Sequence, residues 1–167
     1  EKYMAKINEK LGTNYDLFNY YGAPDADRVI IAMGSICDVA EEVVDYLTAK
    51  GEKVGLVLVR LYRPWVSSAL LKVLPKTATK IAVLDRTKEP GSLGEPLYLD
   101  VATTLREAGM NDVVLPGGLH LATLQHYQVV GQPRQFVGGV RDIQHGDVQL
   151  IAQALQIGQD FRLALLV

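Results

Sequence analysis

Cysteine is nearly absent from this sequence, because Cys37 is the only one among 167 residues. A disulfide needs two cysteines, and an iron–sulfur cluster or a thiolate-bound zinc ion needs several, so the chain by itself can form none of these. A chain without a disulfide framework suits a reducing compartment, and we expect a cytoplasmic protein.

Long apolar runs and an excess of one charge are also missing. Charged residues make up 22% of the chain and leave a net charge of −2, with both signs interspersed. A nucleic-acid-binding protein would carry a basic patch, and a membrane-spanning helix needs ~20 apolar residues in a row. The sequence therefore predicts neither a nucleic acid nor a membrane as a partner, and we recognise no signal peptide in it.

Apolar runs of strand type alternate with amphipathic segments through the middle of the chain. Residues 28–33, 53–59 and 80–84 are typical of strands that are buried on both faces of a parallel sheet. A helix is expected after each of them, with apolar residues on one stripe. This alternation predicts βαβ units in an α/β fold, namely a three-layer α/β/α sandwich.

The N-terminal region has its own pattern. Residues 1–11 suit a short helix with Met4, Ile7 and Leu11 on one face, and the aromatic residues 15–21 suit an edge strand. The chain does not begin with methionine and ends on an apolar run, which favours a piece of a longer protein.

The pattern weakens after residue 109. Residues 113–115 and 135–139 are candidate strands, and a helix capped by Asp147 is expected to follow. We expect a single domain, divided into an N-terminal helix and edge strand in 1–27, core βα units in 28–109 and a divergent tail in 110–167.

The turn at residues 34–38 lies between a strand and a helix, where backbone amides can hold a phosphate. It lacks the glycines of GxGxxG and the GK[ST] of a phosphate-binding loop, and Asp38 would repel an anion. Ser35 and Asp38 instead resemble a capping box, so a capped turn is favoured. Cys37 could be a nucleophile with a lowered pKa, but a small packed side chain is favoured because free cysteines are usually buried.

The three histidines, His120, His126 and His145, are the remaining candidates for metal ligands. His120 and His126 are not spaced to share one helical face, and no acidic residue stands at a zinc-protease spacing from them. We therefore do not expect a metal site in this chain.

Polar and charged residues cluster after the expected ends of two strands. They are Arg60, Tyr62, Arg63, Asp85, Arg86, Lys88, Glu89 and Glu95. Because the carboxyl ends of parallel strands meet at one edge of a sheet, we expect these side chains to lie close together. They could form ion pairs at a domain or subunit interface, bind an anionic substrate, or be a solvated face. The enclosing prolines and glycines require a defined loop, which favours the interface.

Five segments in the first two thirds of the chain resemble one enzyme family. They are YYGA at 20–23, IAMGS at 31–35, VRLYRP at 59–64, IAVLDRTKEPG at 81–91 and LGEPLY at 93–98. Together they resemble pyruvate:ferredoxin (flavodoxin) oxidoreductase, and the segment from 84 to 98 is the most specific. The resemblance covers about residues 15–105, without large gaps.

The resemblance implies a part of a large thiamine diphosphate-dependent iron–sulfur enzyme. That family decarboxylates pyruvate oxidatively with coenzyme A, giving acetyl-CoA, carbon dioxide and reduced ferredoxin or flavodoxin. This chain looks like its second domain, which is similar to the C-terminal domain of transketolase. The resemblance then implies a mostly parallel five-stranded sheet with residues 15–20 as an antiparallel edge strand.

In this family the thiamine diphosphate, Mg²⁺ and [4Fe-4S] clusters are bound by other domains. The resemblance therefore implies no catalytic, cofactor or metal residue here, and a role in packing against other domains and supporting a homodimer. It stops near residue 105. Where the family commonly has a VGGRYGLGSK-type segment, this chain has VGG only at 137–139, followed by VRDI, so we carry no function beyond residue 108.

Two further hypotheses stay open beside the domain of a larger enzyme. One is a free-standing α/β module that binds a small anionic ligand in a pocket beside Arg63 and Arg86. The other is an enzyme in its own right with Cys37 as its nucleophile. The larger-enzyme hypothesis predicts instead an exposed apolar patch around Trp65.

Overall fold

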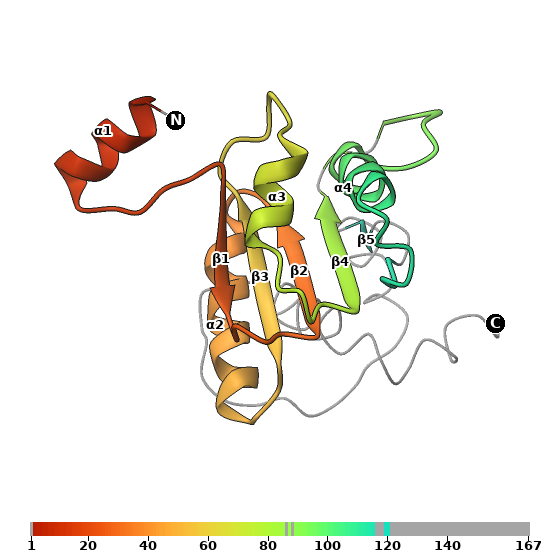
Figure 1. Cartoon of the computed structure of the whole chain (residues 1–167), viewed down its shortest axis with the longest axis horizontal. Helices are drawn as coiled ribbons and strands as arrows, with labels where there is room; N and C mark the ends of the chain where they lie inside the picture. The colour runs from red at the N-terminus through yellow and green to blue at the C-terminus, as the bar shows by residue number, and fades with distance from the viewer. Residues whose placement is uncertain (1, 86, 88, 116–118, 121–167) are drawn as a thin grey trace, which may run out of the picture.

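After an N-terminal helix and strand, the chain alternates between strands and helices from residue 28 onward. In the computed structural model we describe residues 2–85, 87, 89–115 and 119–120 (Figure 1). The elements are α1 (Lys2–Leu11), β1 (Phe18–Gly22), β2 (Arg28–Ala32), α2 (Ile36–Ala49), β3 (Val54–Val59), α3 (Ser67–Val73), β4 (Lys80–Asp85), α4 (Pro96–Glu107) and β5 (Leu119–His120).

One sheet of five strands runs through the centre of the molecule, in the order β1-β3-β2-β4-β5. The strands β2, β3, β4 and β5 run parallel to one another, whereas β1 pairs with β3 in the antiparallel sense. All six residues of β3 are buried, as expected for a strand covered on both faces. The sheet confirms the expected mostly parallel, five-stranded architecture with an antiparallel edge strand.

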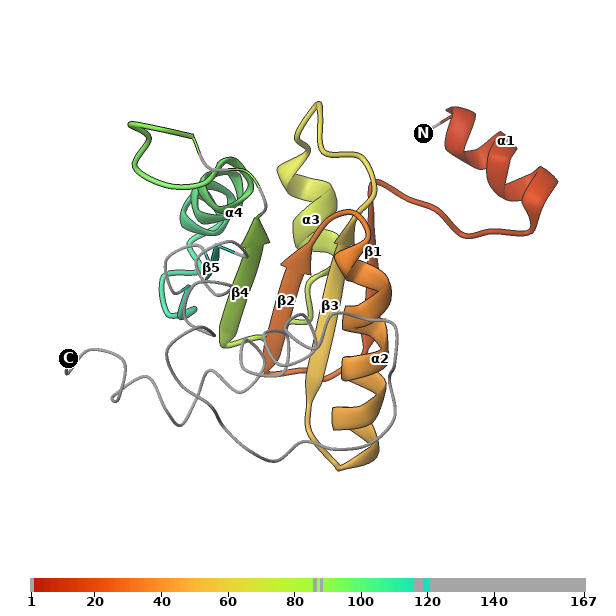
Figure 2. The same cartoon turned by 180° about the vertical axis from the view of Figure 1, so that it is seen from behind.

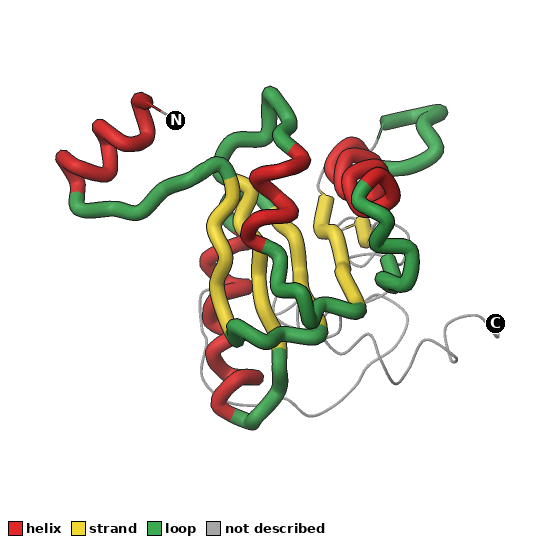
Figure 3. Tube along the Cα trace, in the orientation of Figure 1, coloured by secondary structure: helices red, strands yellow, loops and turns green. Residues whose placement is uncertain are grey.

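Helices cover both faces of this sheet and make three layers. Ile30 points to the face where α2 packs, and its neighbour Ile31 points to the face of α3 and α4, because successive side chains of a strand alternate. Figure 2 brings α2 to the front of the sheet, whereas α3 and α4 are in front in Figures 1 and 3. The three-layer sandwich is thus confirmed.

The start of α2 differs from the expected capping box. Ser35 makes no side-chain hydrogen bond to the helix and already has helical dihedral angles, φ −62° and ψ −19°. Gly34, at φ 82°, turns the chain into the helix, and its carbonyl accepts a hydrogen bond from the Cys37 amide at 3.1 Å. Because the glycine turn brings Ser35 into the helical conformation, its hydroxyl is not in the position from which a cap bonds the helix.

The fifth strand also differs from both candidates. Residues 113–115 contribute only an isolated bridge between Val114 and Lys80, and β5 lies a few residues further on, in a stretch with no clear period. A strand of two residues is too short to show an alternating pattern, so the sequence could not indicate it. The candidate strand at 135–139 and the helix after Asp147 lie outside the described residues.

The last described helix, α4, agrees with its sequence signals. Pro96 occupies its first turn, Leu97, Val101 and Leu105 are buried, and Gly109 follows its end at φ 72°. Within the described part of the chain, no helix is both long and apolar enough to cross a membrane.

Candidate functional site at the carboxyl edge of the sheet

The loops that leave β3 and β4 meet at one edge of the sheet. Both strands are parallel to β2, so the segment after Val59 and the segment after Asp85 emerge on the same side. Figure 1 shows these two loops beside the ends of α3 and α4. Because both loops emerge on the same side, the polar residues that follow β3 and β4 can lie close together, as the sequence predicts. Their hydrogen-bond and ion-pair partners show which of them interact.

Tyr62, Arg63 and Asp100 form a connected polar group, which we call the sheet-edge triad. The Tyr62 hydroxyl donates to Asp100 Oδ2 at 2.7 Å, and Arg63 Nη1 lies 2.8 Å from the same oxygen. Arg63 Nη2 donates to the Tyr62 hydroxyl at 2.9 Å, and its guanidinium lies 3.8 Å from the centre of the Tyr62 ring. The triad fastens the loop after β3 to helix α4.

The triad perturbs the ionisation of two of its members. Partial burial, followed by the hydrogen bond to Asp100, raises the pKa of Tyr62 to about 12. The hydrogen bond to Asp100 raises the pKa of Arg63, so this guanidinium stays charged. Asp100 pairs with one part of the Arg63 guanidinium, while the Arg63 side chain as a whole remains 55% exposed.

Trp65 lies behind the triad and is half-buried. Its indole Nε1 donates to the Thr104 hydroxyl at 2.9 Å, and Ser67 bonds the same oxygen at 2.9 Å. The Trp65 ring stands edge-on to Phe18 and Tyr62, with centroid distances of 5.3 and 6.0 Å. The indole is thus partly buried with its N–H bonded, and the exposed apolar patch expected around Trp65 stays a prediction.

Asp85, at the end of β4, faces inward and is only 1% exposed. Its carboxylate accepts hydrogen bonds from the Leu97 amide at 2.8 Å and from the Thr87 amide at 2.9 Å. The first of these satisfies a free N–H in the first turn of α4, and the second holds the start of the loop. Within the described residues Asp85 thus bonds backbone amides rather than an arginine.

The remaining residues of the sequence-predicted group are spread along this edge. Arg60 lies over the ring of Tyr15 at 5.1 Å. Glu95 is the N-cap residue of α4 and makes no side-chain cap, while the carbonyl of Glu89 accepts the Ser92 amide at 3.1 Å. Arg86 and Lys88 lie outside the described residues. The structure therefore unites Tyr62 and Arg63 and leaves Arg60, Glu89 and Glu95 apart from them.

Sequence reasoning missed two side chains that organise this edge, Asp100 and Thr104. Both stand on α4, four residues apart, beside the apolar stripe of Leu97, Val101 and Leu105. Residues at this spacing share a helix face. Two polar residues beside the apolar stripe could therefore have indicated a polar contact between α4 and its neighbours. Thr104 is 1% exposed, which makes it a core position although its side chain is polar.

The other candidate sites are not supported as reactive centres. Cys37 is 4% exposed, and burial raises the pKa of its thiol to about 11, which agrees with a packed residue and not with an activated nucleophile. Among the residues that the structure describes, no group of three metal-ligating side chains comes together. The candidate ligands His126 and His145 lie outside the described residues.

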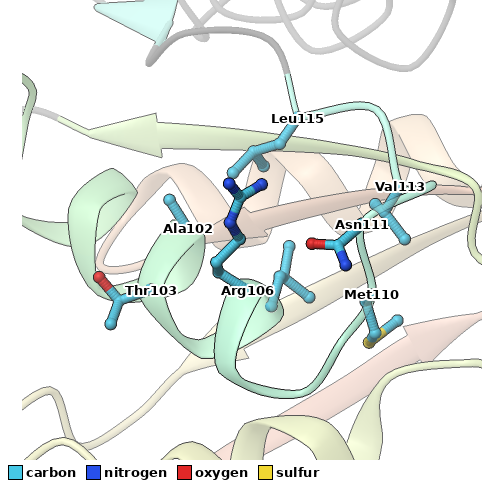
Figure 4. A pocket seen from close by; sticks show the side chains of 8 residues that line it. Ala102, Thr103, Arg106, Met110, Asn111, Val113 and Leu115 are labelled. Carbon is cyan, nitrogen blue, oxygen red and sulfur yellow. The ribbon is translucent and has the colours of Figure 1, made fainter.

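Two hollows mark the described surface. The first, of about 380 Å³, lies between α4 and the segment after it (Figure 4). It is lined by Ala102, Thr103, Leu105, Arg106, Met110, Asn111, Val113 and Leu115. The second, of about 300 Å³, lies beside β1 and includes Tyr15 and Arg60. Neither hollow is lined by Arg63, so the pocket expected of a free-standing anion-binding module is not found in these two places.

The described elements define a three-layer α/β domain with a mixed, mostly parallel sheet. A solved structure described as a split-gene transketolase in an inactive beta4 tetramer superimposes with a TM-score of 0.53. The superposition covers 87% of this chain and 45% of the transketolase chain. The two sequences are 16% identical, so this likeness concerns the fold alone. A family model described as pyruvate:ferredoxin oxidoreductase core domain II matches residues 26–126, and the chain belongs to that family.

The curated relatives are much longer than this chain. A pyruvate-flavodoxin oxidoreductase from Enterobacter agglomerans is 57% identical over 117 residues, which is 70% of this chain and 10% of the relative. A pyruvate:ferredoxin oxidoreductase from Moorella thermoacetica is 60% identical over 114 residues, 68% of this chain and 10% of the relative. The chain thus spans about a tenth of the length of these relatives.

The described residues do not fit the cofactors that the family implies. A [4Fe-4S] cluster takes four thiolates, and the only cysteine of the chain is buried among apolar side chains of the α2 layer. Thiamine diphosphate is held through Mg²⁺ by oxygen ligands, and the carboxylates of Asp85 and Asp100 are already engaged by backbone amides, Tyr62 and Arg63. We derive no chemical step through either group.

Proposed function

We propose that this chain is a non-catalytic core domain of a pyruvate:ferredoxin or pyruvate-flavodoxin oxidoreductase, in which it holds neighbouring domains in place. The observation that carries the proposal is the family match over residues 26–126, which includes all the described elements from β2 to β5. The pairing of the edge residues within the domain supports it, because paired charges rigidify a loop instead of receiving a substrate.

The proposal includes the whole enzyme's activity and partners. The parent enzyme would oxidise pyruvate with coenzyme A in the cytoplasm, as a homodimer, and pass electrons to ferredoxin or flavodoxin. Its thiamine diphosphate, Mg²⁺ and [4Fe-4S] clusters would be bound outside this chain. We treat residues 1–167 as one domain within that enzyme, with 28–109 as its core.

The interdomain contacts would come from the exposed rim of the sheet edge. Its proposed members are Arg60, Tyr62, Arg63, Asp85, Arg86, Lys88, Glu89 and Glu95. Among these, the buried Asp85 would act indirectly by fixing the loop at 86–95, whereas exposed Arg63 would meet a neighbouring domain with the guanidinium edges that Asp100 leaves uncovered.

A domain replacement tests this function. In the Moorella thermoacetica relative, the segment that corresponds to residues 2–126 of this chain is exchanged for those residues, and pyruvate-dependent reduction of ferredoxin is measured. We expect activity within about tenfold of the relative, which corresponds to ~1.4 kcal/mol in the activation barrier. A soluble, cofactor-loaded chimera without activity would contradict the proposal.

Binding measurements on the isolated chain provide the second test. Calorimetry should detect no binding of thiamine diphosphate in the presence of Mg²⁺. Tight binding by this chain alone would mean that the cofactor site lies here, and the scaffold role would then be wrong.

A further inference from the structure

The N-terminal helix α1 carries an apolar stripe that no other described element covers. Tyr3, Ile7 and Leu11 share one face because they are four residues apart, and they are 78%, 43% and 69% exposed. No residue of α1 is fully buried, and Met4, expected on the same face as Ile7 and Leu11, is only partly buried against the core cluster that contains Phe18. Figures 1 and 2 show the helix standing away from the three layers, on the side of β1. An uncovered stripe of this kind typically marks a binding surface.

The helix is nevertheless held in a defined position. Asn8 Nδ2 donates to the Tyr15 carbonyl at 2.8 Å, and Asn8 Oδ1 accepts from the Thr13 hydroxyl at 2.9 Å and from the Tyr15 amide at 2.8 Å. The Tyr15 ring lies under the guanidinium of Arg60, at the edge of the sheet. These contacts connect α1 to the sheet edge, so the stripe is presented by an anchored helix.

Charge on one flank of the stripe narrows the choice of partner. Lys2, Lys6 and Lys10 form a row along the helix at intervals of four residues, next to Tyr3, while Asn8 lies on the opposite flank with the linker. A complementary surface therefore has an apolar groove with carboxylates along one rim.

The size of α1 argues against two other binding partners for its apolar stripe, namely a second copy of this chain and a membrane surface. Ten residues of α-helix are only about 15 Å long, and one such stripe buries far less than the roughly 800 Å² per partner of a stable dimer. The same short stripe would bind a membrane surface only weakly. The curated relatives, in contrast, are about ten times longer than the matched segment and offer most of their surface outside it.

We propose that α1 inserts Tyr3, Ile7 and Leu11 into an apolar, carboxylate-rimmed groove on another domain of the same oxidoreductase. This inference rests on the proposed function and deepens it, because it names a docking element and the chemistry of its partner. The docked helix extends the contact surface from the sheet edge to the N-terminal end of the domain.

Hydrogen exchange in the chimera tests the docking independently of catalysis. In the chimera with residues 2–126, the backbone amides of α1 should exchange at least about a hundredfold more slowly than in the isolated chain, because docking suppresses local opening. The double variant Ile7→Asp/Leu11→Asp should lose this protection and at least about tenfold in activity, while the melting temperature of the isolated chain stays unchanged.

Ala5→Asp is the control, since it adds a single carboxylate to the face of α1 opposite the stripe. It should keep both protection and activity. Equal protection of α1 in the chimera and in the isolated chain would overturn the docking even if the chimera is active. An inactive chimera whose α1 is protected would count against the proposed function and leave the docking standing.

Two further measurements test whether the stripe binds a second copy of this chain or a lipid surface instead. Sedimentation of the isolated chain should give a monomer, and vesicles containing phosphatidylserine should not retain it. Dimerisation or vesicle binding that Ile7→Asp/Leu11→Asp abolishes would assign the stripe to a second copy or to a lipid surface, and would overturn the proposal.

Discussion

Among single residues, Asp85 holds together two segments that are separated in sequence. Its buried carboxylate accepts the amides of Thr87 and Leu97, so it fixes both the start of the loop after β4 and the first turn of α4. We expect Asp85→Ala to lower the free energy of unfolding by about 2–3 kcal/mol, because the Leu97 N–H is left buried without an acceptor. Denaturant unfolding of the isolated chain measures this change.

Asp112→Ala is the control for Asp85→Ala, because Asp112 is exposed in the turn after α4. It should change the free energy of unfolding by less than about 0.5 kcal/mol. If the two variants were equally stable, the buried carboxylate would not be stabilising this corner of the fold.

Cys37 gives a second prediction for a single side chain. Burial raises its pKa to about 11, against an ordinary value near ~8.5, so the reactive thiolate at pH 8 is reduced by at least about a hundredfold. An aromatic disulfide reagent should therefore label the native chain that much more slowly than the urea-unfolded chain. Fast labelling of the folded protein would revive the hypothesis of a nucleophile.

Between elements, Thr104 joins α4 to the segment that leads into α3. Its buried hydroxyl bonds Trp65 Nε1 and Ser67 Oγ, each at 2.9 Å. Thr104→Val keeps the shape of the side chain but leaves the indole N–H unpaired, and we expect a loss of about 1–3 kcal/mol in the free energy of unfolding.

Thr103→Val provides the comparison, because Thr103 is the exposed neighbour on the same helix. It should change stability by less than about 0.5 kcal/mol, as exposed substitutions do. A near-neutral Thr104→Val would show that the polar link between α3 and α4 adds nothing to the apolar packing around it.

The sequence predicted the elements well where burial imposes a period. The three apolar runs became β2, β3 and β4, and the stripe of Leu97, Val101 and Leu105 became the buried face of α4. The sequence-based prediction failed where a few backbone contacts determine the structure. The strand β5 has only two residues, and Gly34, not Ser35, determines the start of α2. Short elements and glycine turns carry too little side-chain pattern to be recognised.

The candidate site was predicted only in part, for a related reason. The sheet edge follows from strand direction, and strand direction follows from the βαβ rhythm, so Tyr62 and Arg63 could be placed on it. Their partner Asp100 could not, because it comes from a helix whose rotation about its own axis is set by packing. Which charges pair is therefore a tertiary property.

For the domain as a unit, alkaline pH should reveal the contribution of the sheet-edge triad. The pKa of Tyr62 and that of Tyr20 are each raised to about 12, mainly by burial, whereas an unfolded tyrosine titrates near ~10. Below pH ~10 both states keep these protons, so the stabilisation is fully present. Between pH ~10 and about 12 the unfolded chain loses protons first, and stability falls as the pH rises.

Tyr62→Phe should make this alkaline decrease shallower, since the Tyr62 contribution is lost while those of Tyr20, Tyr21 and Lys53, whose pKa values are also raised, remain. Tyr3→Phe, at a side chain that is 78% exposed, serves as the comparison. Its stability should depend on pH in the same way as that of the unsubstituted chain. Urea midpoints measured from pH 9 to 12 give the slopes, and tyrosinate absorbance reports ionisation. Identical profiles for all three proteins would mean that the Tyr62 phenol ionises equally in both states.

The antiparallel edge strand has a consequence for how the chain acquires its structure. Among the described strands β1 comes first, yet its partner there is β3, which follows after β2 and α2. During synthesis from the N-terminus, residues 18–22 therefore have no partner in the sheet until β3 has left the ribosome. The strand β1 is synthesised before β3 but joins the sheet only after β3 is available. The position of α1 relative to the sheet is therefore fixed only after β1 has paired with β3.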